Sequence, residues 1–135
     1  MTDLVAAPAN RTALAAGAFR ALSGLSFLVA PQTAQRMWST RPADDPTARL
    51  LLRSMGYRDL LIGGGLAVAA LRDSDAVPMW FLASAGADLA DLVGGLAVRD
   101  ELGRRDHVVG LGGATVGIAV GVAGALCSRR LSAVA

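Results

Sequence analysis

The chain has 135 residues, 53% of them hydrophobic and 16 of them glycine, and its mean hydropathy is +0.47. This composition excludes an ordinary soluble helical domain, which is less apolar and poorer in glycine. All 13 basic residues are arginine, but the net charge is only +2 and no basic run is interleaved with aromatic residues, so nucleic-acid binding is not expected. The single cysteine, Cys127, excludes an intramolecular disulfide and a cysteine-rich metal site.

The first apolar stretch covers residues 12–30. We expect no cleavable signal peptide before it, because Asp3 and only one basic residue, Arg11, precede this stretch and Arg20 interrupts it. The stretch is therefore interpreted as a retained membrane span.

Three further apolar stretches follow, each close to the ~20 residues that a bilayer requires. The connection after the first span has room for a short interfacial helix, with Met37 and Trp38 at headgroup depth. The two later connections are short, which makes sequential helices antiparallel neighbours. The predicted fold is all-α: a single transmembrane domain over residues 1–135, an integral membrane four-helix bundle with spans at about 12–30, 48–71, 77–98 and 107–127.

The arginines outside the spans favour one orientation. If both termini lie on one side, that side carries Arg11, Arg72, Arg129 and Arg130, and the other carries Arg36, Arg41, Arg49, Arg99, Arg104 and Arg105. The positive-inside rule then places both termini outside. A bias toward alanine, glycine and arginine is typical of a GC-rich bacterial genome, so the expected location is the bacterial inner membrane, as a multi-pass protein.

The fourth span carries a stripe of glycines on one face. The spacings are three, four, four and three residues, which let another helix approach closely: Gly110, Gly113, Gly117, Gly121 and Gly124. The stripe fits either packing within the chain or a contact between subunits of a homo-oligomer.

The third span is marginal for insertion because it contains Asp88 and Asp91, one helical turn apart. Each centrally placed Asp costs ~2.5 to 3.5 kcal/mol, whereas the eight Leu, Val and Phe residues of this span return roughly 2.4 to 4.8 kcal/mol together. The span therefore needs polar partners on other helices.

Those partners are predicted from depth. Arg20, Asp59 and Asp88 each fall near the midpoint of a different span, with Arg58 and Asp91 close by. On the second span, Gly56 and Gly63 share a face with Asp59, and on the third, Trp80 and Ser84 share a face with Asp88 and Asp91. We expect these faces to meet in one polar centre.

The polar centre has two interpretations. In the first, Arg53 joins Arg20 and Arg58 and balances the three carboxylates in an ion-pair network that only fixes helix packing. In the second, Arg53 extends to the interface, and one carboxyl of Asp88 and Asp91 keeps a proton, because two adjacent carboxylates in a low dielectric resist double ionisation. A protonated carboxyl beside an ionised one suits an acid/base catalyst or a proton-linked carrier.

Other kinds of site are not expected. Asp88 and Asp91 near arginines make a poor magnesium site, and the sequence has no phosphate-binding glycine loop, nucleophile elbow or zinc motif. We therefore expect neither a metal nor a cofactor. His107 is interpreted as a helix-start residue, and an aromatic pocket wall requires Phe19, Tyr57 and Trp80 to converge on the carboxylates.

Several motifs together resemble a known family. Four segments carry the resemblance: the run from Phe19 to Pro31, Arg36-Met-Trp38, Gly56-Tyr-Arg-Asp-Leu-Leu-Ile-Gly63 and Asp88-Leu-Ala-Asp91. In these segments the chain resembles a family of small four-helix bacterial membrane proteins of unknown function, which are distantly similar to DoxX-like proteins. The resemblance implies a four-helix membrane fold and draws attention to Arg58, Asp59 and the two later aspartates. It implies no activity.

The leading functional hypothesis is a membrane enzyme that isomerises or cyclises a lipophilic, terpenoid- or sterol-like substrate by acid/base catalysis. Membrane sterol isomerases and terpenoid cyclases place acidic residues in helix bundles in the same way, which is an analogy of chemistry and not of sequence. The alternatives are a small proton-linked carrier or exporter and a non-catalytic membrane subunit. The assigned residues are Asp88, Asp91 and Asp59 as catalytic groups, and Arg20, Arg58, Tyr57, Trp80 and Ser84 as substrate-binding or positioning groups.

Overall fold

The structure is a computed structural model that describes residues 8–132, with side chains described over 10–129. The expectation that no cleaved leader precedes residue 12 rests largely on residues outside this range. Five α-helices follow one another, joined by turns, with a short 3₁₀ turn and a π-helical segment before the last: α1 (Pro8–Val29), α2 (Pro31–Trp38), α3 (Pro46–Leu71), α4 (Val77–Ala97), the 3₁₀ turn Arg99–Glu101, the π-helical segment Asp106–Leu111 and α5 (Gly112–Ser132).

The predicted all-helical class is confirmed, since the described residues contain no strand. The helix count is five rather than four, because residues 31–38 of the first connection form α2. The four long helices, α1, α3, α4 and α5, lie over the four predicted stretches. Two helical segments, 10–29 and 106–129, are long and apolar enough to cross a membrane, with mean hydropathies of 1.5 and 1.9.

Local sequence explains where the helices begin. Pro31 and Pro46 occupy the first helical positions of α2 and α3, where a backbone N–H is not needed. Asp45 caps α3, and its Oδ2 accepts a hydrogen bond from the backbone nitrogen of Ala48 at 2.8 Å. After α3 the chain turns through Asp73, whose φ of 48° is left-handed, and α4 runs back.

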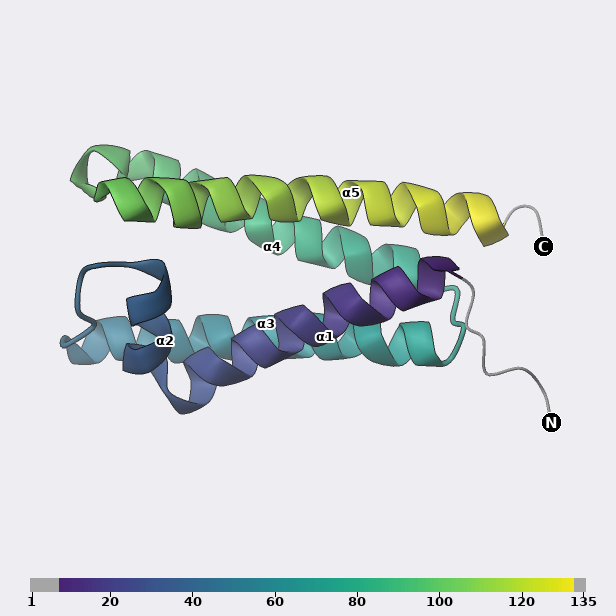
Figure 1. The fold of residues 1–135 in the computed structure, drawn as a ribbon, viewed down its shortest axis with the longest axis horizontal. Coiled ribbons are helices and arrows are strands. Elements are labelled where there is room, and N and C mark those ends of the chain that lie inside the picture. The colour runs from purple at the N-terminus through teal and green to yellow at the C-terminus, as the bar shows by residue number, and fades with distance from the viewer. Residues whose placement is uncertain (1–7, 133–135) are drawn as a thin grey trace.

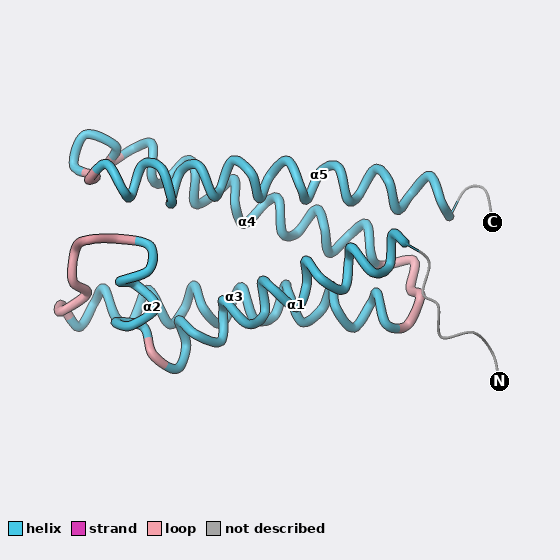
Figure 2. The backbone as a smooth tube through the Cα atoms, in the orientation of Figure 1, coloured by secondary structure: helices cyan, strands magenta, loops and turns pink. Residues whose placement is uncertain are grey.

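The long helices form two layers (Figure 1). One layer is α1 lying along α3, and the other is α4 lying along α5. The beginning of α1 and the end of α5 lie at the same end of the molecule as the turn between α3 and α4. At the other end, α2 and the connection of residues 39–45 extend toward the start of α5 (Figure 2).

Two pairs of glycines bring α1 and α3 into backbone contact. Gly17 faces Gly63, and Gly24 faces Gly56, so the two helices touch at positions seven residues apart on each. A Cβ added to Gly17 would lie 2.7 Å from the carbonyl oxygen of Gly63, and one added to Gly56 would lie 2.6 Å from that of Gly24. Only glycine permits this approach, which is typical of close helix packing.

The glycine stripe of α5 packs mostly within the chain. Gly117 lies against the side chain of Asp88, Gly121 against Ala85, and Gly124 against the ring of Phe81. The stripe that was considered as a subunit contact is therefore covered by α4 along this length. The physical reason is that the short connection between α4 and α5 makes these two helices antiparallel neighbours, so α4 packs on the stripe.

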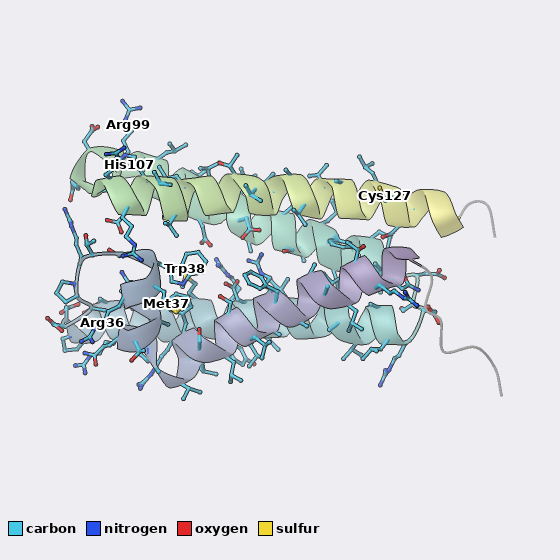
Figure 3. All side chains as sticks on the ribbon, in the orientation of Figure 1. Arg36, Met37, Trp38, Arg99, His107 and Cys127 are labelled. Carbon is cyan, nitrogen blue, oxygen red and sulfur yellow. The ribbon has the colours of Figure 1, made fainter. Side chains whose placement is uncertain are left out.

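The distribution of apolar side chains is unusual for a globular domain. The packed core is small, lies at the end where α1 begins and α5 ends, and contains Leu66 and Phe81 surrounded mainly by alanines. Large apolar side chains instead cover the outside of all four long helices (Figure 3), as shown by Leu22, Val29, Leu50, Leu61, Leu71, Leu89, Val93, Val116 and Leu126. The interior is thus built from small and charged residues and the exterior from large apolar ones.

The glycine contacts give a prediction about stability with a matched control in the same helix. Gly63→Ala should lower the melting temperature, because its Cβ would collide with the backbone of α1 at a cost of about 1 to 3 kcal/mol. Gly64→Ala should leave it unchanged or raise it, since nothing lies within 4 Å and alanine favours the helix by about 0.8 to 1.0 kcal/mol. Thermal melts of the purified variants measure both, and equal melting temperatures would contradict the close contact.

Candidate functional site

Arg20 connects three helices through its guanidinium. Its Nη1 donates to both carboxylate oxygens of Asp88, at 3.0 and 2.9 Å, and to the hydroxyl oxygen of Ser84 at 2.7 Å. Its Nη2 donates to Oδ1 of Asp59 at 2.9 Å. The side chains of Arg20, Asp59 and Asp88 are only 14%, 15% and 13% exposed, so these ion pairs are largely buried.

Arg58 continues the arrangement toward the outside. Its Nη1 and Nη2 donate to the two carboxylate oxygens of Asp91, at 2.9 and 2.7 Å, and its Nε donates to Oδ1 of Asp59 at 3.2 Å. The side chains of Arg58 and Asp91 are 32% and 41% exposed. This paired, two-bond geometry is the strong form of an arginine–carboxylate contact.

The five charged side chains form one continuous charge chain, in the order Asp88, Arg20, Asp59, Arg58, Asp91. It crosses from α4 to α1 to α3 and back to α4. The predicted polar centre therefore contains all five residues expected there and also Ser84. Arg53, in contrast, is exposed and makes no ion pair with any described residue. The charge chain therefore contains three carboxyl groups and two guanidiniums, and Arg53 does not add a third guanidinium.

The backbone contacts explain how the charges reach one another. Arg20 lies halfway between Gly17 and Gly24 on α1, and Asp59 lies halfway between Gly56 and Gly63 on α3. Because these glycines hold the two backbones together, the charged side chains between them are brought within direct contact. On the other side, Gly117 of α5 leaves the space that the carboxylate of Asp88 occupies.

Asp88 and Asp91 do not act as a pair in this structure. Each accepts hydrogen bonds from its own guanidinium, and one is largely buried while the other is exposed. The expectation of a proton shared between them assumed that they face the same way without separate partners. Their positions on α4 differ by three residues, about 60° around the helix axis and about 4.5 Å along it. Asp88 therefore contacts Arg20 of α1, and Asp91 contacts Arg58 of α3.

An open pocket lies beside the exposed end of the charge chain. Its volume is ≈ 600 Å³ and its walls are mostly apolar. It is lined by Gln35, Pro42, Ala43, Ala48, Leu51, Leu52, Ser54, Met55, Arg58 and Asp91. The sequence-based expectation did not include the first eight of these residues. Gln35, Pro42 and Ala43 come from α2 and the connection after it, and their position depends on how that connection folds back over α3.

The condition for an aromatic pocket wall, convergence of Phe19, Tyr57 and Trp80 on the carboxylates, is not met. Phe19 is 71% exposed and Tyr57 is 55% exposed, and both lie on outward faces. Each directly precedes an arginine of the charge chain, and neighbouring helical residues are rotated by about 100°, so an inward arginine directs the aromatic ring away. Trp80 packs against Gly65 of α3, beside the small core.

The aromatic contact that the structure does contain lies elsewhere. The rings of Phe27 and Trp38 have centroids 6.1 Å apart, which connects α2 to α1. Met37, next to Trp38, is exposed (Figure 3). His107 lies in the π-helical segment, where its Nδ1 is 3.1 Å from the carbonyl oxygen of Gly103, in agreement with a role at the helix start. Within residues 8–132, no group of three or more His, Cys, Asp and Glu residues is arranged to hold a metal ion.

The two halves of the charge chain should respond differently to substitution. Arg20→Gln leaves Asp59 and Asp88 without their common partner, and losing one member of a buried ion pair costs roughly 3 to 5 kcal/mol. Arg58→Gln should cost less, because Asp59 keeps Arg20 and Asp91 is exposed. Thermal melts measure the difference.

The double variant Arg20→Gln, Asp88→Asn tests the electrostatic cause. Removing the unpaired carboxylate should restore part of the lost stability. If the double variant is less stable than Arg20→Gln alone, the ion pair is not the source of the effect.

Comparison with known protein families identifies the family of the chain. The model of a family described as a domain of unknown function (DUF4267) matches residues 17–126, which include the whole charge chain. No curated protein and no solved structure matches the chain. The expectation of a family of unknown function is thereby supported, whereas none of these matches links the chain to DoxX-like proteins. The chain belongs to the DUF4267 family.

Proposed function

We propose that the chain is an integral membrane protein whose four long helices cross the bilayer. The main support is the arrangement of its side chains, with glycine, alanine and paired charges inside and large apolar residues outside. In the two segments that are apolar enough to span, only 22% and 11% of residues are buried, whereas a core helix of a soluble protein is mostly buried. Lipid would cover the exposed faces.

The charges on α3 and α4 fit this placement. Arg58, Asp59, Asp88 and Asp91 lower the hydropathy of these two helices, but each is paired with an opposite charge. Charges that face the interior of a bundle and pair with one another are the form in which membrane helices tolerate them. The two helices that carry them therefore need α1 to insert stably.

The proposed orientation has both termini outside the cell, and cysteine labelling tests it. In a Cys127→Ser background, Asp75→Cys lies in the turn at the end where α1 begins and α5 ends, and Asp100→Cys lies in the connection at the opposite end. A membrane-impermeant maleimide added to intact cells should label the first and should label the second only after permeabilisation. The reverse pattern would invert the orientation, and labelling of both would contradict a spanning topology.

We further propose that the pocket beside Arg58 and Asp91 binds a lipophilic small molecule with a polar group at one end. The observation that carries this proposal is the contrast within the pocket, where apolar walls from Leu51, Leu52 and Met55 meet one guanidinium–carboxylate pair. A volume of ≈ 600 Å³ lies in the range of about 300 to 1,000 Å³ usual for small-molecule sites. A carbonyl or hydroxyl of the ligand would exchange hydrogen bonds with the pair.

The geometry favours one form of acid/base chemistry over the others. Asp91 accepts hydrogen bonds from Arg58 on both oxygens, and in this arrangement its carboxylate would act as a base. Asp91 would remove a proton from the carbon that lies between a carbonyl group and a carbon–carbon double bond, with the electrons spreading over a dienolate whose oxygen lies beside Arg58. Returning the proton to the far carbon of the original double bond moves that double bond next to the carbonyl group, which completes an isomerisation with no other reactant. Asp59 and Asp88, which were expected to be catalytic, would instead hold Arg20 in place.

A binding experiment tests the pocket with closely matched variants. Protein purified in mild detergent from its host membrane should retain a lipophilic small molecule in native mass spectrometry. Leu51→Trp should lose the molecule because the ring fills the pocket. Leu50→Trp is the control, since Leu50 is as exposed as Leu51 but does not line the pocket. Equal occupancy in all variants would exclude this site.

The isomerase form has its own readout. A total membrane lipid extract incubated with the protein in D₂O should gain deuterium in one lipophilic species, because the proton on Asp91 exchanges with solvent between its removal and return. Asp91→Asn should slow the incorporation by roughly 100-fold or more, the usual contribution of a general base. Binding without any incorporation would favour a carrier over an enzyme.

A further inference from the structure

A second pocket lies at the opposite end of the molecule from the beginning of α1 and the end of α5. Its volume is ≈ 480 Å³, and it is lined by Thr40, Arg104, Arg105, Val108 and Val109. It forms where the connection after α2 approaches the start of the helix that becomes α5 (Figure 1). None of its residues belongs to the charge chain or to the pocket beside Asp91.

The lining has an unbalanced positive charge. It contains two guanidiniums and no carboxylate. Arg105 donates from Nη2 to the backbone carbonyl oxygen of Met37 at 2.9 Å, a contact that fixes the guanidinium without neutralising it. Arg104 is exposed and makes no ion pair with any residue in the described range.

The nearby acidic side chains are engaged elsewhere or exposed. Asp106 accepts a hydrogen bond from the backbone nitrogen of Gly103 at 3.1 Å, and Asp100 pairs with Arg99. Glu101 is exposed, and its backbone carbonyl accepts a hydrogen bond from Arg41. The two arginines of the pocket therefore attract an anion that comes from outside the chain.

The rest of the lining is largely apolar, with Val108 and Val109 beside the two arginines. Val108 is exposed, and so are Val116 and Val120 farther along α5. A ligand that fits both parts has an anionic head of phosphate size and a hydrocarbon tail. Thr40 adds a hydroxyl that can donate to a phosphate oxygen.

We propose that this pocket binds the headgroup of an anionic phospholipid, with the phosphate between Arg104 and Arg105 and an acyl chain along the valines of α5. Basic pockets at the ends of membrane helices bind anionic headgroups in this way, and each arginine near the surface contributes several-fold to affinity. The proposal rests on the membrane placement proposed above but not on any function of the pocket beside Asp91.

Thermal melting in mild detergent tests the site with two lipids of the same acyl chains. Phosphatidylglycerol should raise the melting temperature more than phosphatidylcholine, whose choline group would bring a cation to the arginines. Arg104→Gln should raise by roughly fivefold the concentration of phosphatidylglycerol needed for the same rise in melting temperature. Thr40→Val should raise that concentration by less. Arg36→Gln is the control, since it removes an exposed arginine from the same end of the molecule but away from the pocket (Figure 3).

Three results would overturn the proposal. Equal stabilisation by both lipids would remove the preference for a negative headgroup, and equal stabilisation by inorganic phosphate would mean that the site takes a free anion. An effect of Arg36→Gln as large as that of Arg104→Gln would mean that net charge alone attracts the lipid. Carbonate washing of host membranes separates this proposal from the previous one: release of the protein overturns the membrane placement itself, whereas retention without a lipid preference overturns only the lipid site.

Discussion

The position of Arg20 depends on the cost of burying charge. A guanidinium removed from water must be matched by carboxylates at hydrogen-bonding distance, and Arg20 meets this need by contacting Asp59 on α3 and Asp88 on α4 at once. No other described residue forms ion pairs with two helices other than its own. These contacts require that Arg20, Asp59 and Asp88 lie at one depth. They therefore restrict both the register of α1 against α3 and the distance between the two layers.

The sequence was sufficient to predict which charges meet, because depth and helical periodicity are local properties. Counting from the ends of the apolar stretches placed Arg20, Asp59 and Asp88 together, and the structure brings them into contact. The prediction that Trp80, Ser84 and Asp88 face the polar centre together was correct only in part. Ser84 accepts a hydrogen bond from Arg20, whereas Trp80 packs on Gly65. Periodicity gives the face of a helix but not which neighbour covers it.

Features that depend on tertiary path were not predictable in this way. The pocket beside Asp91 is closed on one side by Gln35, Pro42 and Ala43, and nothing in their local pattern indicates that the connection folds back over α3. The separate partners of Asp88 and Asp91 depend on where α1 and α3 lie relative to α4. The glycines of α5 were correctly identified as a packing face, but only the arrangement of the helices shows that α4 covers it.

The charge chain therefore combines two environments in one set of contacts. Its Arg20 end is buried and satisfies the needs of helix packing, and its Asp91 end opens on an apolar pocket. The residues matched by the DUF4267 family model include both ends.

The paired glycines of α1 and α3 also have a mechanical consequence. Two helices whose backbones touch at both ends of a seven-residue interval cannot slide past each other without first separating, so α1 and α3 form a rigid unit. The contact between this unit and α4 at the height of the pocket is made instead by long arginine side chains, which can change rotamer while keeping a carboxylate partner. A movement of α4 against α1 and α3 at this height would therefore require rotamer changes of Arg20 and Arg58, whereas the pocket itself is bounded mainly by α2, the connection after it and α3.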